Sequence, residues 1–207
     1  MRYDVHYVLK GMSIGFAIAA PVGPIGVLCI RRSLVQGFRI GFITGLGAAT
    51  ADAIYGCIAA FGLTAIARFL TGQQFWLGLI GGSFLCGLGI RIFTSKPATQ
   101  EVEIQSRGWM TAYSSTLVLT LANPATILSF IAGFASFGLG TSPDFLAAST
   151  CALGVFIGSS LWWLILSAGI TKIQSQFNFI SLRIINRLSG CILCGFGFYI
   201  VFRSMFK

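Results

Sequence analysis

Long apolar runs, separated by short polar stretches, dominate the sequence. The hydrocarbon core of a bilayer is about 30 Å thick, and a helix needs about 20 apolar residues to cross it. Six runs approach this length, and the sixth is the shortest. They cover residues 8–30, 40–67, 75–94, 114–137, 145–170 and 188–202. The pattern predicts an all-α integral membrane protein with six transmembrane helices, the first of them uncleaved.

The polar connections predict how the chain is divided. Residues 95–113 form the most polar stretch, and three apolar runs lie on each side of it. We expect a single transmembrane domain, 1–207, built from half-repeats of about 1–94 and 114–207 joined by a cytoplasmic linker, 95–113. Residues 172–187 are either a connecting loop or an amphipathic helix at the membrane interface.

Two prolines interrupt the first apolar run, in the sequence Pro21-Val22-Gly23-Pro24. Proline has no N–H group, so the helical carbonyls of Ala17 and Ala20 lose their partners. Open backbone at membrane depth is tolerated only where protein buries it or a watery cavity adjoins it. The run therefore predicts either a broken helix beside a cavity or a kinked helix whose carbonyls are satisfied by neighbours.

The second half repeats this feature. Residues 20–28 read APVGPIGVL and residues 120–128 read TLANPATIL, so Gly23-Pro24 corresponds to Asn123-Pro124. Because each half has three spans, the two copies cross the membrane in opposite directions. Inverted repeats with helices interrupted near the midplane are typical of secondary transporters. The pairing favours the cavity and predicts an inverted 3+3 repeat with proline-broken helices 1 and 4.

Composition and charge agree with a membrane protein. Hydrophobic residues make up 56% of the chain and charged residues 9%, with a net charge of +9. The basic residues are scattered among short loops, which excludes nucleic-acid binding and suits the positive-inside rule. One side of the predicted membrane carries nine of them: Arg31, Arg32, Arg39, Arg91, Lys96, Arg107, Lys172, Arg183 and Arg187. The other carries five: Arg2, Lys10, Arg68, Arg203 and Lys207. We therefore expect both termini outside.

Asp52 is the only acidic residue within the six runs. It lies about 18 Å along the second helix, near the bilayer centre, where a charge is unfavourable by about 2.5–3.5 kcal/mol. Such residues usually face a transport site or proton path. Tyr55 lies on the same face among small residues. The structural alternative is a protonated Asp52 that is hydrogen-bonded to a neighbour such as Tyr55.

The second break adds a site for an anion. Asn123 is a good N-cap and Pro124 suits the first helical turn, so a helix is expected to restart there. The N–H groups of a helix N-terminus attract carboxylates. We hypothesise a zwitterion site whose carboxylate binds at the helix starts and whose ammonium faces Asp52. The predicted site residues are Pro21, Gly23, Pro24, Asp52, Tyr55, Asn123 and Pro124.

The sequence contains few other candidate functional groups. All six cysteines lie within the predicted spans, where a thiol packs as a small apolar group. Cys191-x-x-Cys194 has the spacing of a metal or redox pair, but no second pair or histidine cluster supports that function. We expect no metal, no cofactor and no enzymatic activity.

The stretch from Pro21 to Leu34, PVGPIGVLCIRRSL, with the glycines after it and GLGAATAD ending at Asp52, resembles the LysE/RhtB family of bacterial amino-acid exporters. Residues 119–124, LTLANP, are similar too. Many members have Asn or Gln-Asn after Gly-Pro, where this chain has Ile25-Gly26. The departure removes a polar side chain from a substrate-facing position and puts lysine, homoserine and threonine in doubt as substrates.

The resemblance implies a multi-pass exporter of amino acids or related small metabolites in the bacterial inner membrane, with a small-molecule substrate, protons and lipid as partners. It implies transport-site roles for Pro24, Asp52, Asn123 and Pro124. We expect proton coupling through Asp52; whether the chain forms a homo-oligomer stays open. The alternatives are an intramembrane thiol-redox carrier and a cation or metal efflux protein.

Overall fold

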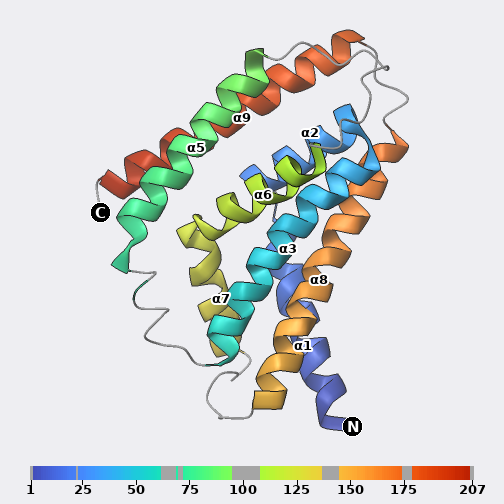
Figure 1. Cartoon of the computed structure of the whole chain (residues 1–207), viewed down its shortest axis with the longest axis vertical. Helices are drawn as coiled ribbons and strands as arrows, with labels where there is room; N and C mark the ends of the chain where they lie inside the picture. The colour runs from blue at the N-terminus through green and yellow to red at the C-terminus, as the bar shows by residue number, and fades with distance from the viewer. Residues whose placement is uncertain are drawn as a thin grey trace.

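The computed structural model describes residues 2–21, 23–61, 69, 72–94, 108–136, 145–173 and 179–205. In these ranges the chain forms eight helices and no strands, which confirms the all-α prediction (Figure 1). The helices are α1 (Arg2–Ala19), α2 (Pro24–Gln36), α3 (Phe38–Ala60), α5 (Gln74–Thr94), α6 (Gly108–Leu121), α7 (Pro124–Ser136), α8 (Phe145–Lys172) and α9 (Phe179–Met205).

Four helices contain a stretch that is long and apolar enough to cross a membrane by itself: Phe38–Ala60, Phe75–Thr94, Phe145–Lys172 and Arg183–Met205. Two bent pairs meet the same criteria together, which raises the number of candidate spans in the described ranges to as many as six. Large apolar side chains such as Phe145, Leu188 and Phe198 are exposed on these helices. Exposed apolar surface of this kind suits contact with lipid tails.

The predicted helix breaks are both present. α1 ends at Ala19, and α2 begins at Pro24 with a bend of 82° between them. α6 ends at Leu121, and α7 begins at Pro124 after a bend of 65°. In each case a proline occupies the first helical position, where its missing N–H costs no hydrogen bond. The prolines therefore start new helices instead of kinking continuous ones.

Several predicted boundaries are wrong. The apolar run predicted to end at residue 30 continues as helix to Gln36, because Arg31 and Arg32 are buried within α2. The predicted sixth span, 188–202, is the core of the 27-residue helix α9. Its first turns take up residues 179–187 of the predicted connection 172–187, and residues 174–178 lie outside the described part. Charged residues at a helix end reach the interface, so helices extend beyond their apolar core.

The predicted linker, 95–113, is shorter than expected at its C-terminal end. Residues 108–113 already belong to α6, whereas residues 95–107 lie outside the described part. The predicted second span, 40–67, corresponds to α3, which begins slightly earlier, at Phe38, and ends at Ala60.

Glycines bring two helix pairs into close backbone contact. α1 runs parallel to α8, and a Cβ added at Gly11 would lie 2.0 Å from the Cys151 carbonyl oxygen. One added at Gly158 would lie 2.0 Å from the Met12 carbonyl oxygen. α5 and α9 run antiparallel along one side of the molecule, with Gly82 and Gly197 at their contact (Figure 1). Small residues at these surfaces allow the two backbones to approach this closely.

Candidate functional site

The two helix breaks face one cavity of about 100 Å³. The α1–α2 break lines it with Ile18, Ala19, Pro21, Gly23, Pro24, Ile25 and Gly26. The other lining residues are Ala48 and Asp52 of α3, Thr120, Asn123 and Thr126 of the α6–α7 break, and Trp163 of α8. Five predicted site residues, Pro21, Gly23, Pro24, Asp52 and Asn123, are therefore brought together from three separate segments of the chain.

Asp52 is buried on α3 and hydrogen-bonded to the neighbouring helix. Only 4% of its surface is exposed, and the Ser159 hydroxyl donates to its Oδ2 at 2.7 Å. The Trp163 indole N–H in turn donates to the Ser159 oxygen at 3.2 Å. This chain of two hydrogen bonds fixes the carboxyl group from α8. The second oxygen of Asp52 remains available for a group in the cavity.

The start of α2 supplies hydrogen-bond donors. Gly23 is the N-cap with φ of −110°, and no side chain caps the helix. The first backbone bond of the helix runs from Val27 N–H to the Gly23 carbonyl, so the N–H groups of Ile25 and Gly26 have no intrahelical acceptor. Both residues line the cavity. An anion there would meet free amides and the positive end of the helix dipole.

Tyr55 is bonded to the backbone at the second break and not to Asp52. Its hydroxyl donates to the carbonyl of Leu121, the last residue of α6. Backbone bonds from Asn123 to Thr120 and from Thr126 to Asn123, both 3.1 Å, shape the turn that follows. Tyr55 is therefore not the hydrogen-bond partner of Asp52; the neighbour in that position is Ser159, so the alternative of a protonated Asp52 bonded for packing stays open. Pro124 begins α7, and its side chain lies outside the described part.

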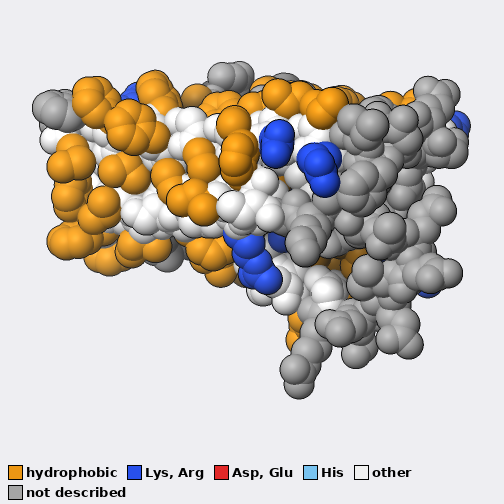
Figure 2. Space-filling model, turned by 90° about the horizontal axis from the view of Figure 1, so that it is seen from above, with side chains coloured by type: hydrophobic (Ala, Val, Ile, Leu, Met, Phe, Trp, Pro, Cys, Tyr) orange, Lys and Arg blue, Asp and Glu red, His pale blue; other side chains and the backbone are white. Residues whose placement is uncertain are grey.

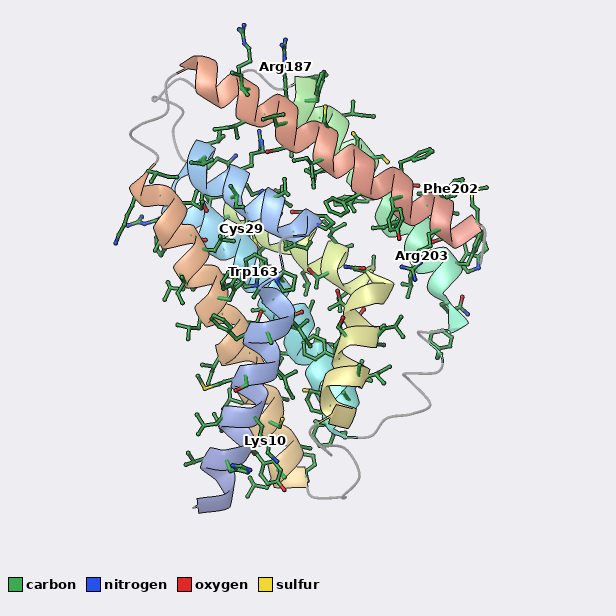
Figure 3. The ribbon with its side chains drawn as sticks, turned by 180° about the vertical axis from the view of Figure 1, so that it is seen from behind. Lys10, Cys29, Trp163, Arg187, Phe202 and Arg203 are labelled. Carbon is green, nitrogen blue, oxygen red and sulfur yellow. The ribbon has the colours of Figure 1, made fainter. Side chains whose placement is uncertain are left out.

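Sequence reasoning missed the contribution of α8. Ser159 and Trp163 are four residues apart and so share a helix face, which was a usable signal. A second signal was the place of Trp163 within a span, since membrane tryptophans usually gather at the interfaces. Figure 3 shows Trp163 near Cys29 in the middle of the molecule, far from Lys10. Neither signal identifies the helix that faces Asp52.

Comparison with known proteins assigns the family. The sequence model of the LysE type translocators matches residues 16–204. This chain belongs to the LysE type translocator family. The match confirms the resemblance found in the sequence. It makes the protein a multi-pass membrane translocator and not an enzyme.

Three relatives cover most of this LysE type translocator. A Bacillus subtilis (strain 168) protein, YcgF, whose name describes an amino acid efflux protein, is 28% identical over 95% of this chain and 96% of its own. The arginine exporter protein ArgO of Escherichia coli (strain K12) is 25% identical over 90% and 89%. The chemotactic transduction protein ChpE of Pseudomonas aeruginosa is 30% identical over 75% and 77%. No solved structure matches.

Two arginines of this LysE type translocator, which were predicted to lie in a loop, are buried within α2. Arg32 is buried in α2, and its guanidinium donates to Thr44 of α3 and to the Ala112 carbonyl, Ser115 and Thr116 of α6. Arg31 is also buried and donates from Nε to Asn186 of α9 at 2.9 Å. Because α6 and α9 follow the predicted linker, the two arginines join α2 to the second half.

The six cysteines of the translocator are free thiols. Across the α5–α9 contact, the Cys86 thiol donates to the Cys194 carbonyl and the Cys194 thiol to the Cys86 carbonyl, at 3.7 and 3.6 Å. Cys191 is exposed on another face of α9. Among the described residues, no three metal-binding side chains form a group.

Proposed function

We propose that this translocator is a secondary active exporter of amino acids or related small metabolites across the bacterial plasma membrane. The relatives YcgF and ArgO support the substrate class by their names. One observation carries the mechanism: Asp52 lies in the same cavity as the broken ends of α1–α2 and α6–α7. A charged acid at that depth in a membrane is energetically unfavourable, and such residues usually bind a substrate or carry a proton.

The proposed architecture is six spans in an inverted repeat, with halves of about 1–94 and 114–207. Several of the helix contacts support it, because they occur in pairs that exchange the halves. α1 packs on α8 as α6 packs on α3, and α2 contacts α8 as α7 contacts α3. The pairs α3 with α8 and α5 with α9 are their own counterparts, whereas the close contact of α2 with α3 is not matched, in the described ranges, by one of α7 with α8. A two-fold axis in the membrane plane produces the matched pairs.

The cavity suits a zwitterion. A substrate carboxylate would accept hydrogen bonds from the Ile25 and Gly26 amides at the start of α2, and an ammonium would donate to Asp52. Asn123 lines the same cavity and offers both a donor and an acceptor. The two ends of an amino acid would thus meet groups on two different helices, α2 and α3.

Proton coupling follows from competition at one carboxyl group. Asp52 holds either a proton or the substrate ammonium, because its Oδ2 is already bound to Ser159. Substrate leaving outward and a proton entering would then alternate at Asp52 as the two halves rock around the cavity. The proposed orientation has both termini outside.

The test is export from vesicles loaded with a panel of labelled amino acids under an imposed pH gradient. Asp52→Asn keeps the shape of the side chain and its bond from Ser159 but removes the charge, so gradient-driven export should fall to background. Thr50→Val, on the same helix with a hydroxyl bonded to Leu46 and Tyr113, is the matched control and should export normally. Full gradient-driven export by a well-folded Asp52→Asn variant would contradict the coupling function.

A further inference from the structure

We infer that Trp163 sets the upper size of the substrate side chain and that the translocator exports small, uncharged amino acids. This inference rests on the proposed export function and adds its specificity. It starts from the division of the cavity wall into a polar part and an apolar part.

The part of the apolar wall beside Asp52 is formed by Ala19, Ala48 and Trp163, and Ile18, Ile25 and the two prolines line the rest. The side chains of Ala19, Ala48 and Trp163 belong to one buried cluster with Cys29 and Ala49, and all three also line the cavity. The polar groups, Asp52 and the α2 amides, are the expected partners of the ammonium and the carboxylate. The side chain of a bound amino acid would therefore face Trp163 and the two alanines.

Charge in the cavity excludes a basic side chain. Asp52 is the only ionisable residue among the described residues that line it. Once the α-ammonium group is paired with Asp52, a second cationic group has no counter-charge among these residues. This distinguishes the chain from its relative ArgO, whose name gives arginine as the substrate.

Trp163 cannot turn aside for a larger substrate. Only 3% of its surface is exposed, and its indole N–H is held by Ser159 at 3.2 Å. From the other side it packs on Gly45 of α3, where an added Cβ would lie 2.2 Å from the Trp163 Cβ and 2.5 Å from its Cγ. The indole ring is therefore held in place as one wall of the cavity.

The experiment measures initial export of glycine, alanine, valine, leucine, phenylalanine and arginine from loaded vesicles. Wild type should export the small uncharged amino acids well and leucine, phenylalanine and arginine poorly. Trp163→Ala should raise the ratio of leucine to alanine export by about tenfold or more, since a single methylene in an apolar pocket already changes selectivity about 10- to 200-fold. Trp163→Phe should keep the wild-type size order, because it retains a large ring.

The neighbouring tryptophan provides a matched control. Trp162 lies on the same helix but packs edge-on against Phe16, with ring centroids 5.4 Å apart. Trp162→Ala removes the same volume from a side chain that does not line the cavity and should leave the size order unchanged. If Trp163→Ala does not fold, Ala48→Val tests the same wall in the opposite sense, because it narrows the cavity and should abolish valine export before glycine export.

The outcomes separate the specificity from the function. A change in size order with Trp163→Ala or Ala48→Val, and none with Trp162→Ala, supports the inference. Export by wild type with the same size order in every folded variant, or with arginine as its best substrate, overturns the inference but leaves amino-acid export standing. No export of any amino acid by folded wild type overturns both.

Discussion

At the scale of single residues, Tyr55 shows how the backbone of the second helix break is satisfied. For the first break, the prolines predicted either a cavity or a kinked helix whose Ala17 and Ala20 carbonyls are satisfied by neighbours, and that break borders a cavity. At the second break, Tyr55 donates to the Leu121 carbonyl at the end of α6. Backbone opened by the two breaks therefore meets both a cavity and a side-chain donor.

Tyr55→Phe should destabilise the protein by about 1–3 kcal/mol, because the buried Leu121 carbonyl loses its donor. Thermal unfolding in detergent measures the change. Tyr113→Phe is the control: Tyr113 donates to the Thr50 hydroxyl at 2.9 Å, and that hydroxyl still binds Leu46 after the substitution. Equal losses in the two variants would show that the Leu121 carbonyl does not depend on Tyr55.

Asp52 and the prolines could be found from the sequence because each violates a rule of membrane helices by itself. Trp163 and Ser159 violate none strongly, and their place opposite Asp52 depends on how α8 packs on α3. Arg31 and Arg32 were misplaced for a related reason. The positive-inside rule assigns arginines to loops, whereas neutral acceptors on α3, α6 and α9 keep these two inside the protein.

At the scale of helices, glycine position decides which pairs approach. Glycines lie at the close surfaces of α1, α5 and α8. Their positions in the sequence do not reveal the partner helix, because a face lined with glycine can pack against any helix. The parallel pairing of α1 with α8 crosses between the halves and was visible only in the structure.

Gly158→Ala should destabilise the α1–α8 contact by about 1–3 kcal/mol, because its new methyl group would press on the Met12 backbone. Gly169→Ala, on the same helix, meets nothing within 4 Å and should be neutral or stabilising by up to about 1 kcal/mol through helix propensity. Melting temperatures of the two variants in one detergent provide the comparison. Destabilisation by Gly169→Ala as large as by Gly158→Ala would rule out the contact as the cause.

At the scale of the whole molecule, several basic side chains lie at the end where α2 stops and α9 starts. Viewed from the end where α2 stops and α9 starts, the described surface shows Lys and Arg beside broad apolar sides (Figure 2). Arg187 lies at this end, and Arg203 lies at the opposite end of α9 (Figure 3). Removing the buried Arg31 and Arg32 from the predicted nine leaves seven basic residues on one side against five on the other, so the sign of the bias is unchanged.

Both termini should therefore lie outside the cytoplasm. Alkaline phosphatase fused after Lys207 should be active and green fluorescent protein there should be dark, since each reporter works on one side only. Reporters inserted in the predicted linker after Pro97 should give the reverse pattern. The opposite result at both positions would invert the proposed topology.

The parallel contact of α1 with α8 also governs how the protein is made. Gly11 meets Cys151, 140 residues later in the chain. At about 5–20 residues per second, the ribosome takes roughly 7–28 s to supply the partner. During that interval the glycine face of α1 is in the bilayer without its match. Lipid or the insertion machinery must cover this face until α8 is made. We therefore expect substitutions on the glycine face of α1 to reduce correct insertion during synthesis as well as the stability of the folded translocator.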